Sequence, residues 1–200
     1  VQQDSPDTGI TVHAYNRSGQ LTRSVDAKGQ GSVYAYDVSG RLMSIDREGS
    51  DYDISYSYDQ CANGLGRLCS ISAGWGHSIQ YSWNALGEKT SVVTNEGEIS
   101  YTYGLQGAIE SIVYPSGREV EFHNDGGALA SSITLVAQGL PEIKLVDEIK
   151  YSPFRRPVSW RLGNGKVTNI DLDTRHRPVS MNVPGVWNWE ISEFDAVDNP

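Results

Sequence analysis

A short motif recurs along the whole chain and limits what the chain can fold into. An aromatic residue, usually followed by Asp or Asn, precedes Gly by four positions, and Arg-Leu or a related pair comes next, as in Tyr36–Leu42 and Tyr15–Leu21. Copies begin at residues 15, 36, 58, 83, 103, 123, 151, 172 and 194, in steps of 20 to 28 residues. A period of this size indicates a repeat protein in which each small unit packs on its neighbours.

The aromatic residue, the acid, the Gly and the Arg-Leu pair are the positions expected to build the repeat. The copy at Tyr58 reaches its Gly66-Arg67 pair after four extra residues. The expected repeat residues are Tyr15, Gly19, Tyr36, Asp37, Gly40, Arg41, Leu42, Tyr58, Asp59, Gly66, Arg67, Trp83, Gly87, Tyr103, Gly107, Gly127, Tyr151, Asp173, Phe194 and Asp195.

A second series of turns lies about ten residues after the first. Its glycines are Gly29, Gly49, Gly76, Gly97, Gly117, Gly139, Gly165 and Gly185. Asp or Asn at the start of a turn bonds to its own backbone, and Gly at the end accepts a positive φ. A chain that turns every ~10 residues leaves no room for a typical helix of ~11 residues. The sequence therefore predicts an all-β fold of tandem antiparallel β-hairpins.

The segments between turns have the pattern of strands. Residues 54–58, 79–83 and 99–103 alternate apolar and polar side chains, which places a row of aromatic rings on one face. A helix is the competing interpretation for residues 128–145, where Gly and Pro are sparser. The β-branched residues of 133–136 and the turn at Gly139 favour strand there as well.

Charge and hydropathy exclude two kinds of partner. The net charge is −9 with a pI near 4.8, and no basic run is present, which argues against nucleic acid. The apolar stretches are far shorter than the ~20 residues that span a membrane. We divide the chain into a lead-in, residues 1–11, and a repeat array, residues 12–200, and interpret it as a fragment of a longer protein.

The Tyr-Asp-x-x-Gly-Arg-Leu unit at a period near 22 resembles the YD repeats of Rhs proteins, Tc-toxin shell subunits and teneurins. Two segments resemble the bacterial Rhs branch in particular: Tyr-Ser-Pro-Phe at 151–154 with Leu-Gly-Asn-Gly at 162–165, and the insertion from Cys61 to Cys69. The resemblance implies that hairpins join edge to edge into one continuous curved or spiralling sheet. In the family that sheet forms a hollow shell around a C-terminal toxin.

The resemblance also implies partners and a location. The partners are a C-terminal toxin cargo and the remainder of the same shell, with secretion-spike proteins as a further candidate. The protein would be secreted or delivered out of a bacterial cell, for example as a type VI secretion effector. Open strand edges would allow fragments to associate edge to edge. No segment here resembles the family's Asp-containing self-cleavage core, so self-cleavage is not expected of these residues.

Cys61 and Cys69 lie on the two sides of the enlarged turn. A disulfide would staple the insertion, and hairpin neighbours can satisfy its geometry. Two free thiols are the alternative. Metal binding is disfavoured because no His lies beside them at ligand spacing.

Residues that could support catalysis are scattered or have a structural explanation. The histidines are His13, His77, His123 and His176, and no Gly-x-Ser-x-Gly motif is present. Neighbouring acids such as Asp51 and Asp53 fall in or beside turns, where Asp is expected. We therefore expect no enzyme activity, no catalytic residue, no cofactor and no metal.

The aromatic rows leave one alternative function open. Packing between neighbouring hairpins is the first interpretation of these rings. The alternative is an extracellular adhesion or carbohydrate-binding module that stacks sugars on rings such as Trp75 or Trp83.

Overall fold

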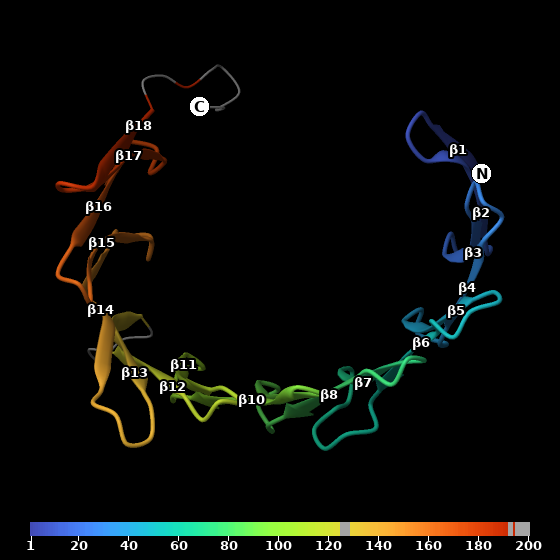
Figure 1. The fold of residues 1–200 in the computed structure, drawn as a ribbon, viewed down its shortest axis with the longest axis horizontal. Helices are drawn as coiled ribbons and strands as arrows, with labels where there is room; N and C mark the ends of the chain where they lie inside the picture. The colour runs from blue at the N-terminus through green and yellow to red at the C-terminus, as the bar shows by residue number, and fades with distance from the viewer. Residues whose placement is uncertain (125–128, 192–193, 195–200) are drawn as a thin grey trace. The chain divides into compact units, whose positions relative to one another are not determined.

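The computed structural model describes residues 1–124, 129–191 and 194, and in that part of the chain it contains strands and turns without a helix. The predicted all-β fold class is therefore confirmed (Figure 1). The segment 128–145, where a helix was the alternative, contributes strands at Ala130–Val136 and Ile143–Tyr151. Gly127 and Asp195, two expected repeat residues, lie outside the described residues.

The first of two compact units covers Val1–Ile99. From β1 to β8, each strand pairs antiparallel with the strand that follows it in the chain. The strands are β1 (Gln2–Ser5), β2 (Gly9–Tyr15), β3 (Leu21–Val25), β4 (Gly31–Tyr36), β5 (Leu42–Arg47), β6 (Ile54–Tyr58), β7 (Leu68–Ala73), β8 (Ser78–Trp83) and β9 (Lys89–Thr94). The lead-in predicted at residues 1–11 thus contains β1 and the start of β2.

The second unit covers Ser100–Pro200 and has the same connectivity. It holds most of β10 (Gly97–Tyr103), followed by β11 (Ile109–Val113), β12 (Glu119–Asn124), β13 (Ala130–Val136), β14 (Ile143–Tyr151), β15 (Pro157–Leu162), β16 (Val167–Leu172), β17 (Pro178–Val183) and β18 (Trp187–Glu190).

The two faces of the sheet in the first unit differ in chemistry. On one face apolar residues lie opposite one another across successive strands: Tyr34 pairs with Ile45, and Ile45 pairs with Ile54. On the other face small polar residues do so: Ser44 pairs with Ser55, and Ser55 with Ser72. These two rows follow from the period-two alternation of the strand sequences.

Stability in each unit comes from contacts between adjacent strands. Among the described residues, Cys69 at 6% and Val183 at 7% exposure are the only buried apolar side chains. Four small polar residues are also buried: Ser91, Ser111, Thr134 and Thr168. No second layer of the described residues covers either face, so side-chain pairs across neighbouring strands are the main packing unit.

Candidate functional site

The repeat motif forms a turn with one recurrent geometry. In the copy at Tyr36, the backbone N–H of Gly40 donates to the Asp37 carbonyl oxygen at 3.0 Å, and the N–H of Asp37 donates to the Arg41 carbonyl oxygen at 2.9 Å. Gly40 has φ 83°, and the strand register shifts at Tyr36, just before the turn. This combination is a turn closed by a glycine bulge, which bends the chain back into the next strand.

The acid of the motif caps this turn with its side chain. Asp37 Oδ1 accepts hydrogen bonds from the backbone N–H groups of Ser39 at 2.9 Å and Arg41 at 2.8 Å. The same pair of bonds recurs at Asn16, Asn84 and Asp173. The acid or amide therefore fixes the backbone of its own turn.

The residue after the motif glycine reaches forward to the next unit. Arg41 Nη1 donates to Asp59 Oδ1 at 3.1 Å, and the guanidinium carbon lies 4.4 Å from the centre of the Tyr58 ring. Arg41 Nε also bonds to Asp37 Oδ2 at 2.6 Å. One guanidinium thus joins its own turn to the aromatic-acid pair of the following copy, an arrangement that we call the arginine clamp.

Other copies reach forward in the same way with different atoms. Gln20 Nε2 donates to the Gly40 carbonyl oxygen at 3.0 Å, and Arg156 Nη1 donates to the His176 carbonyl oxygen at 2.9 Å. Arg67 lies 5.7 Å from the Trp83 ring centre, and Arg177 lies 3.8 Å from that of Phe194. The forward contact is therefore a property of the repeat position.

The aromatic residue of the motif reaches backward. Tyr36 Oη donates to the Leu21 carbonyl oxygen at 2.9 Å, and Trp83 Nε1 donates to the Leu68 carbonyl oxygen at 3.1 Å. Both acceptors are the Leu that ends the preceding motif copy. Tyr151 Oη makes a similar bond to the Ala130 carbonyl oxygen at 2.8 Å. Each unit is thus joined to its neighbour in both directions.

The insertion between Tyr58 and Arg67 carries a disulfide between Cys61 and Cys69. Within it, Asn63 Nδ2 donates to the Trp83 carbonyl oxygen at 3.0 Å, while Arg67 Nη1 donates to the Asn63 carbonyl oxygen at 3.1 Å. The stapled loop therefore supports the contact to the next unit.

Two degenerate copies hold a side chain where the motif has Gly. Arg155 has φ 62° and His176 has φ 61°, both in the left-handed region. An L-residue with a Cβ in this region costs about 1–2 kcal/mol, a cost that Gly escapes.

Substituting glycine at these two positions is expected to stabilise the protein. Arg155→Gly should raise the free energy of unfolding by about 1 kcal/mol, because the relieved strain exceeds the added entropy of the unfolded chain. His176→Gly should gain less, since the His176 ring also contacts Phe154 at 4.2 Å between ring centres. Urea denaturation measures both changes. Gly40→Ala places a Cβ at the same motif position and should destabilise the protein. A loss of stability in Arg155→Gly would contradict the assignment of backbone strain to this position.

The carboxylates of the motif are held in the ionised state. Hydrogen bonds from the Arg41 backbone, followed by its side chain, lower the pKa of Asp37. The Arg41 side chain, followed by the Gly66 N–H, lowers the pKa of Asp59. The Arg177 backbone and side chain lower that of Asp173 in the same way. These groups favour the folded state when ionised.

Acid should therefore weaken the fold within a defined range. A lowered folded pKa gives stability that is fully present above the unfolded pKa of about 4 and is lost as the pH falls through the lower, folded pKa. We expect the urea midpoint to be level from pH 7 to about pH 5 and to fall below about pH 4. The double variant Asp37→Asn/Asp59→Asn should show a shallower fall, and an unchanged acid profile would exclude these carboxylates as its source.

Several contacts at the opposite edge, where the second series of turns lies, were not foreseen from the sequence. Asn95 Nδ2 donates to the Gly76 carbonyl oxygen at 2.9 Å, and Arg23 pairs with Glu48 at 2.8 Å. The two partners of each contact are far apart in sequence, so only the strand register brings them together. A separate irregularity lies inside β14, where Glu148 has φ 52°.

The described residues hold no group of three or more His, Cys, Asp or Glu that could bind a metal ion. Within the same residues, the structure has no helix long and apolar enough to cross a membrane. The geometry is that of contacts that hold each hairpin to the next, made by turns, guanidinium groups and aromatic rings.

A family model supports the interpretation of the repeat. Residues 15–51 match the RHS Repeat family, and this stretch contains the two clearest motif copies. The predicted resemblance to YD-repeat or Rhs proteins is confirmed over this stretch: residues 15–51 carry the RHS repeat. None of the curated proteins compared with the sequence matches it.

Solved structures of Tc toxins share the fold. The Photorhabdus luminescens Tc holotoxin pore, with a substitution in TccC3, matches with a TM-score of 0.76 and 15% identity over 99% of this chain and 11% of that chain. The crystal structure of TcdB2-TccC3-TEV matches with a TM-score of 0.75 and 16% identity over 100% of this chain and 11% of that chain. For TcdB2-TccC3 the TM-score is 0.75 and the identity 15%, over 98% and 12%. This chain thus spans about a tenth of the length of those chains.

Proposed function

We propose that this chain is a wall segment of a toxin-encapsulating shell, and that its task is mechanical. The observation that carries the proposal is the two-way fastening of successive hairpins, with Arg41 reaching forward to Asp59 and Tyr36 reaching backward to Leu21. A wall must be continuous along its length, and these contacts hold each repeat against the next. The likeness to TcdB2-TccC3 supports the same interpretation.

The partners follow from this role. They are a toxin domain located C-terminal to the wall and the remainder of the same shell, with a secretion-spike protein as the carrier. The complete protein would be secreted or delivered out of the producing bacterium and would act in competition between bacteria. The wall itself takes no part in chemical catalysis. Its side chains are engaged in turn capping and in contacts between hairpins.

The carbohydrate-binding alternative requires ring faces that are free to stack on sugars. Trp83 is half-buried, its Nε1 is bonded to Leu68, and Arg67 lies over its ring. Its role in the repeat therefore favours packing. Tyr58 has the same arrangement under Arg41. These contacts favour the wall over the adhesion module for the rings of the motif.

Protease protection tests the proposal. The full-length polypeptide that carries this segment is digested with a broad-specificity protease, and mass spectrometry follows its C-terminal region. The same region expressed alone is the control. Survival in the full-length protein together with degradation of the isolated region is the expected result. Equal degradation of both would remove the shell interpretation, and binding on glycan arrays would then favour the adhesion module.

A further inference from the structure

Two aromatic residues stand outside the repeat motif at the edge formed by the second series of turns. Tyr52 lies in an enlarged loop: nine positions separate Gly49 from Tyr58, whereas seven separate Gly29 from Tyr36. The extra residues place Tyr52 beyond the end of β5, with 55% of its surface exposed. The repeat pattern does not account for a ring at this position.

Trp75 occupies the neighbouring turn, between β7 and β8. It precedes Gly76, at a turn position that Lys28 and Glu48 fill in the two preceding turns of this series. Trp75 is 49% exposed, and its ring centre lies 5.5 Å from that of Tyr52 with the planes inclined at 56°. The His77 ring lies 6.1 Å from Trp75 on the same turn. Two large rings thus form an exposed pair.

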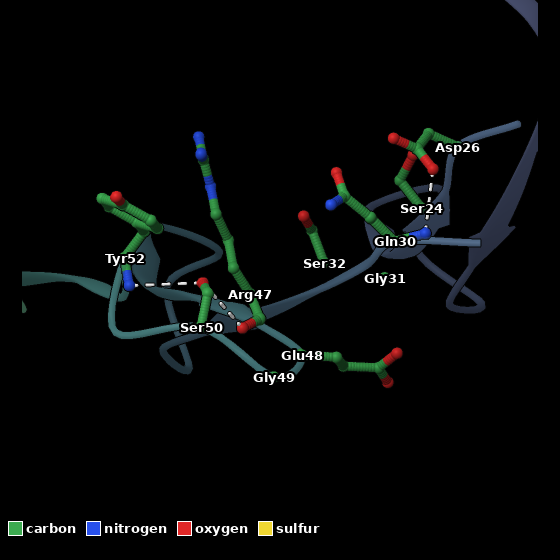
Figure 2. Close-up of a pocket in the computed structure, with 10 residues that line it drawn as sticks. All are labelled: Ser24, Asp26, Gln30, Gly31, Ser32, Arg47, Glu48, Gly49, Ser50 and Tyr52. Atoms are coloured by element: carbon green, nitrogen blue, oxygen red, sulfur yellow. Dashed lines mark hydrogen bonds between the residues drawn. The ribbon is translucent and has the colours of Figure 1, made fainter. Parts of the chain in front are cut away.

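The backbone holds this pair in place. The Gly74 N–H donates to the Asp53 carbonyl oxygen at 2.8 Å, and the Arg47 N–H donates to Asp53 Oδ1 at 2.9 Å. Ser50 Oγ accepts from the Tyr52 N–H at 3.3 Å and donates to the Arg47 carbonyl oxygen at 3.1 Å, as Figure 2 shows. The loop is therefore a bonded structure that presents Tyr52 to its neighbour.

A pocket of about 660 Å³ lies at the ring pair, and carboxylates are its only charged groups. Its lining includes Ser50, Asp51, Tyr52, Asp53 and Trp75, and neither Lys nor Arg lines it. An adjoining pocket of about 460 Å³ shares Ser50 and Tyr52 and contains Arg47.

The chain itself provides a precedent for what such a pocket recognises. In the arginine clamp, the guanidinium of Arg41 lies over the Tyr58 ring and bonds to two carboxylates, Asp37 and Asp59. The pocket at Tyr52 presents the same three elements, an aromatic face and two acids. Among the described residues, the guanidinium groups that lie over rings do so at Tyr58, Trp83 and Phe194, and none lies over Tyr52 or Trp75. A flat cation with apolar faces satisfies rings and carboxylates together.

We propose that Tyr52, Trp75 and Asp51 form a binding site for the guanidinium group of an arginine side chain that another polypeptide supplies. The cation would stack on the exposed ring pair while Asp51 accepts its N–H groups. This assignment is independent of the proposed wall function, because it concerns the edge of the sheet that the repeat motif leaves unused.

The test uses nuclear magnetic resonance on the 200-residue chain labelled with nitrogen-15. The indole N–H signals of its five tryptophans are followed while N-acetyl-arginine amide is added at low salt. N-acetyl-citrulline amide is the matched ligand: it has nearly the same planar shape, but it is neutral and carries a carbonyl oxygen in place of one N–H2 group of the guanidinium. The Trp75 signal, assigned with Trp75→Phe, should shift with the arginine compound, and the citrulline compound should bind at least about fivefold more weakly.

Variants make the assignment specific. Asp51→Asn should weaken binding of the arginine compound about threefold to fivefold, and Trp75→Ala should abolish the saturable shifts of other signals around Tyr52. Trp187→Ala removes a comparably exposed tryptophan elsewhere, 45% exposed, and should leave binding unchanged. Equal binding of the two ligands, unchanged binding in Asp51→Asn, or a Trp75 signal that responds only to a neutral oligosaccharide would each overturn the proposal.

Discussion

Replacing both Cys61 and Cys69 with serine should lower the free energy of unfolding by about 2.5 kcal/mol, the loop-closure value for a ring of this size. The ring is short, with a sequence separation of 8, but it encloses Asn63, Arg67 and Leu68, which contact Trp83 of the next unit. Gly64 packs against the two sulfur atoms, since a Cβ there would lie 2.5 Å from the Cys61 sulfur. Loss of the staple frees this whole segment in the unfolded chain.

The effect should extend to the neighbouring hairpin. Asn63 bonds to the Trp83 carbonyl oxygen, and Arg67 covers the Trp83 ring. Urea denaturation gives the overall change, and amide hydrogen exchange should show faster exchange in β8 as well as β7. Treating the unmodified protein with a reductant should reproduce the double variant. Ser72→Ala, on the exposed polar face, is the control. A loss of stability in the double cysteine variant that is as small as the loss in Ser72→Ala would contradict the account.

The second large effect is expected at Gly163. A Cβ at this position would lie 2.1 Å from the Lys144 carbonyl oxygen, a backbone atom that cannot rotate away. The Gly163 N–H also donates to the Leu145 carbonyl oxygen at 2.9 Å, so β14 and the end of β15 approach closely here. Gly163→Ala must push the two strands apart, and we expect a loss of about 2–3 kcal/mol.

A second glycine supplies the matched control. At Gly104 the nearest atom to an added Cβ is Glu110 Oε1 at 2.6 Å, the end of a flexible side chain that can move. Gly104→Ala should therefore cost less than about 1 kcal/mol. Urea denaturation of the two variants under the same conditions measures the difference. Equal losses would mean that close backbone approach does not decide the cost.

The sequence predicts the fold well because turns and strands are local. The glycine after Asp37 indicates its own turn, and the alternation in residues 54–58 indicates its own strand. Positive φ at Arg155 and His176 could not be read in this way, because both residues carry a Cβ that disfavours the left-handed region. The only signal in the sequence was their place in the motif, since each of the two residues stands where other copies have Gly.

The residues of the site could be predicted from the motif, but the contacts between them were harder to predict. Arg41 and Asp59 are both motif residues, yet their pairing depends on the register between β5 and β6. Tyr52 and Trp75 lie in different turns and meet only when those turns are side by side. Gln20 occupies the arginine position without a charge and still reaches the next turn, to Gly40. Which residues of adjacent units contact each other could be learned only from the structure.

The central claim is that the motif fastens each hairpin to the next, and a double-mutant cycle tests it most directly. Arg41→Met, Asp59→Asn and the double variant are compared by urea denaturation, with Arg23→Met, whose natural partner is Glu48, as the control partner for Asp59→Asn. If the arginine clamp joins the two units, the double variant should lose clearly less stability than the sum of the single losses, while the control pair should be additive. Additive losses for Arg41 and Asp59 would contradict the claim.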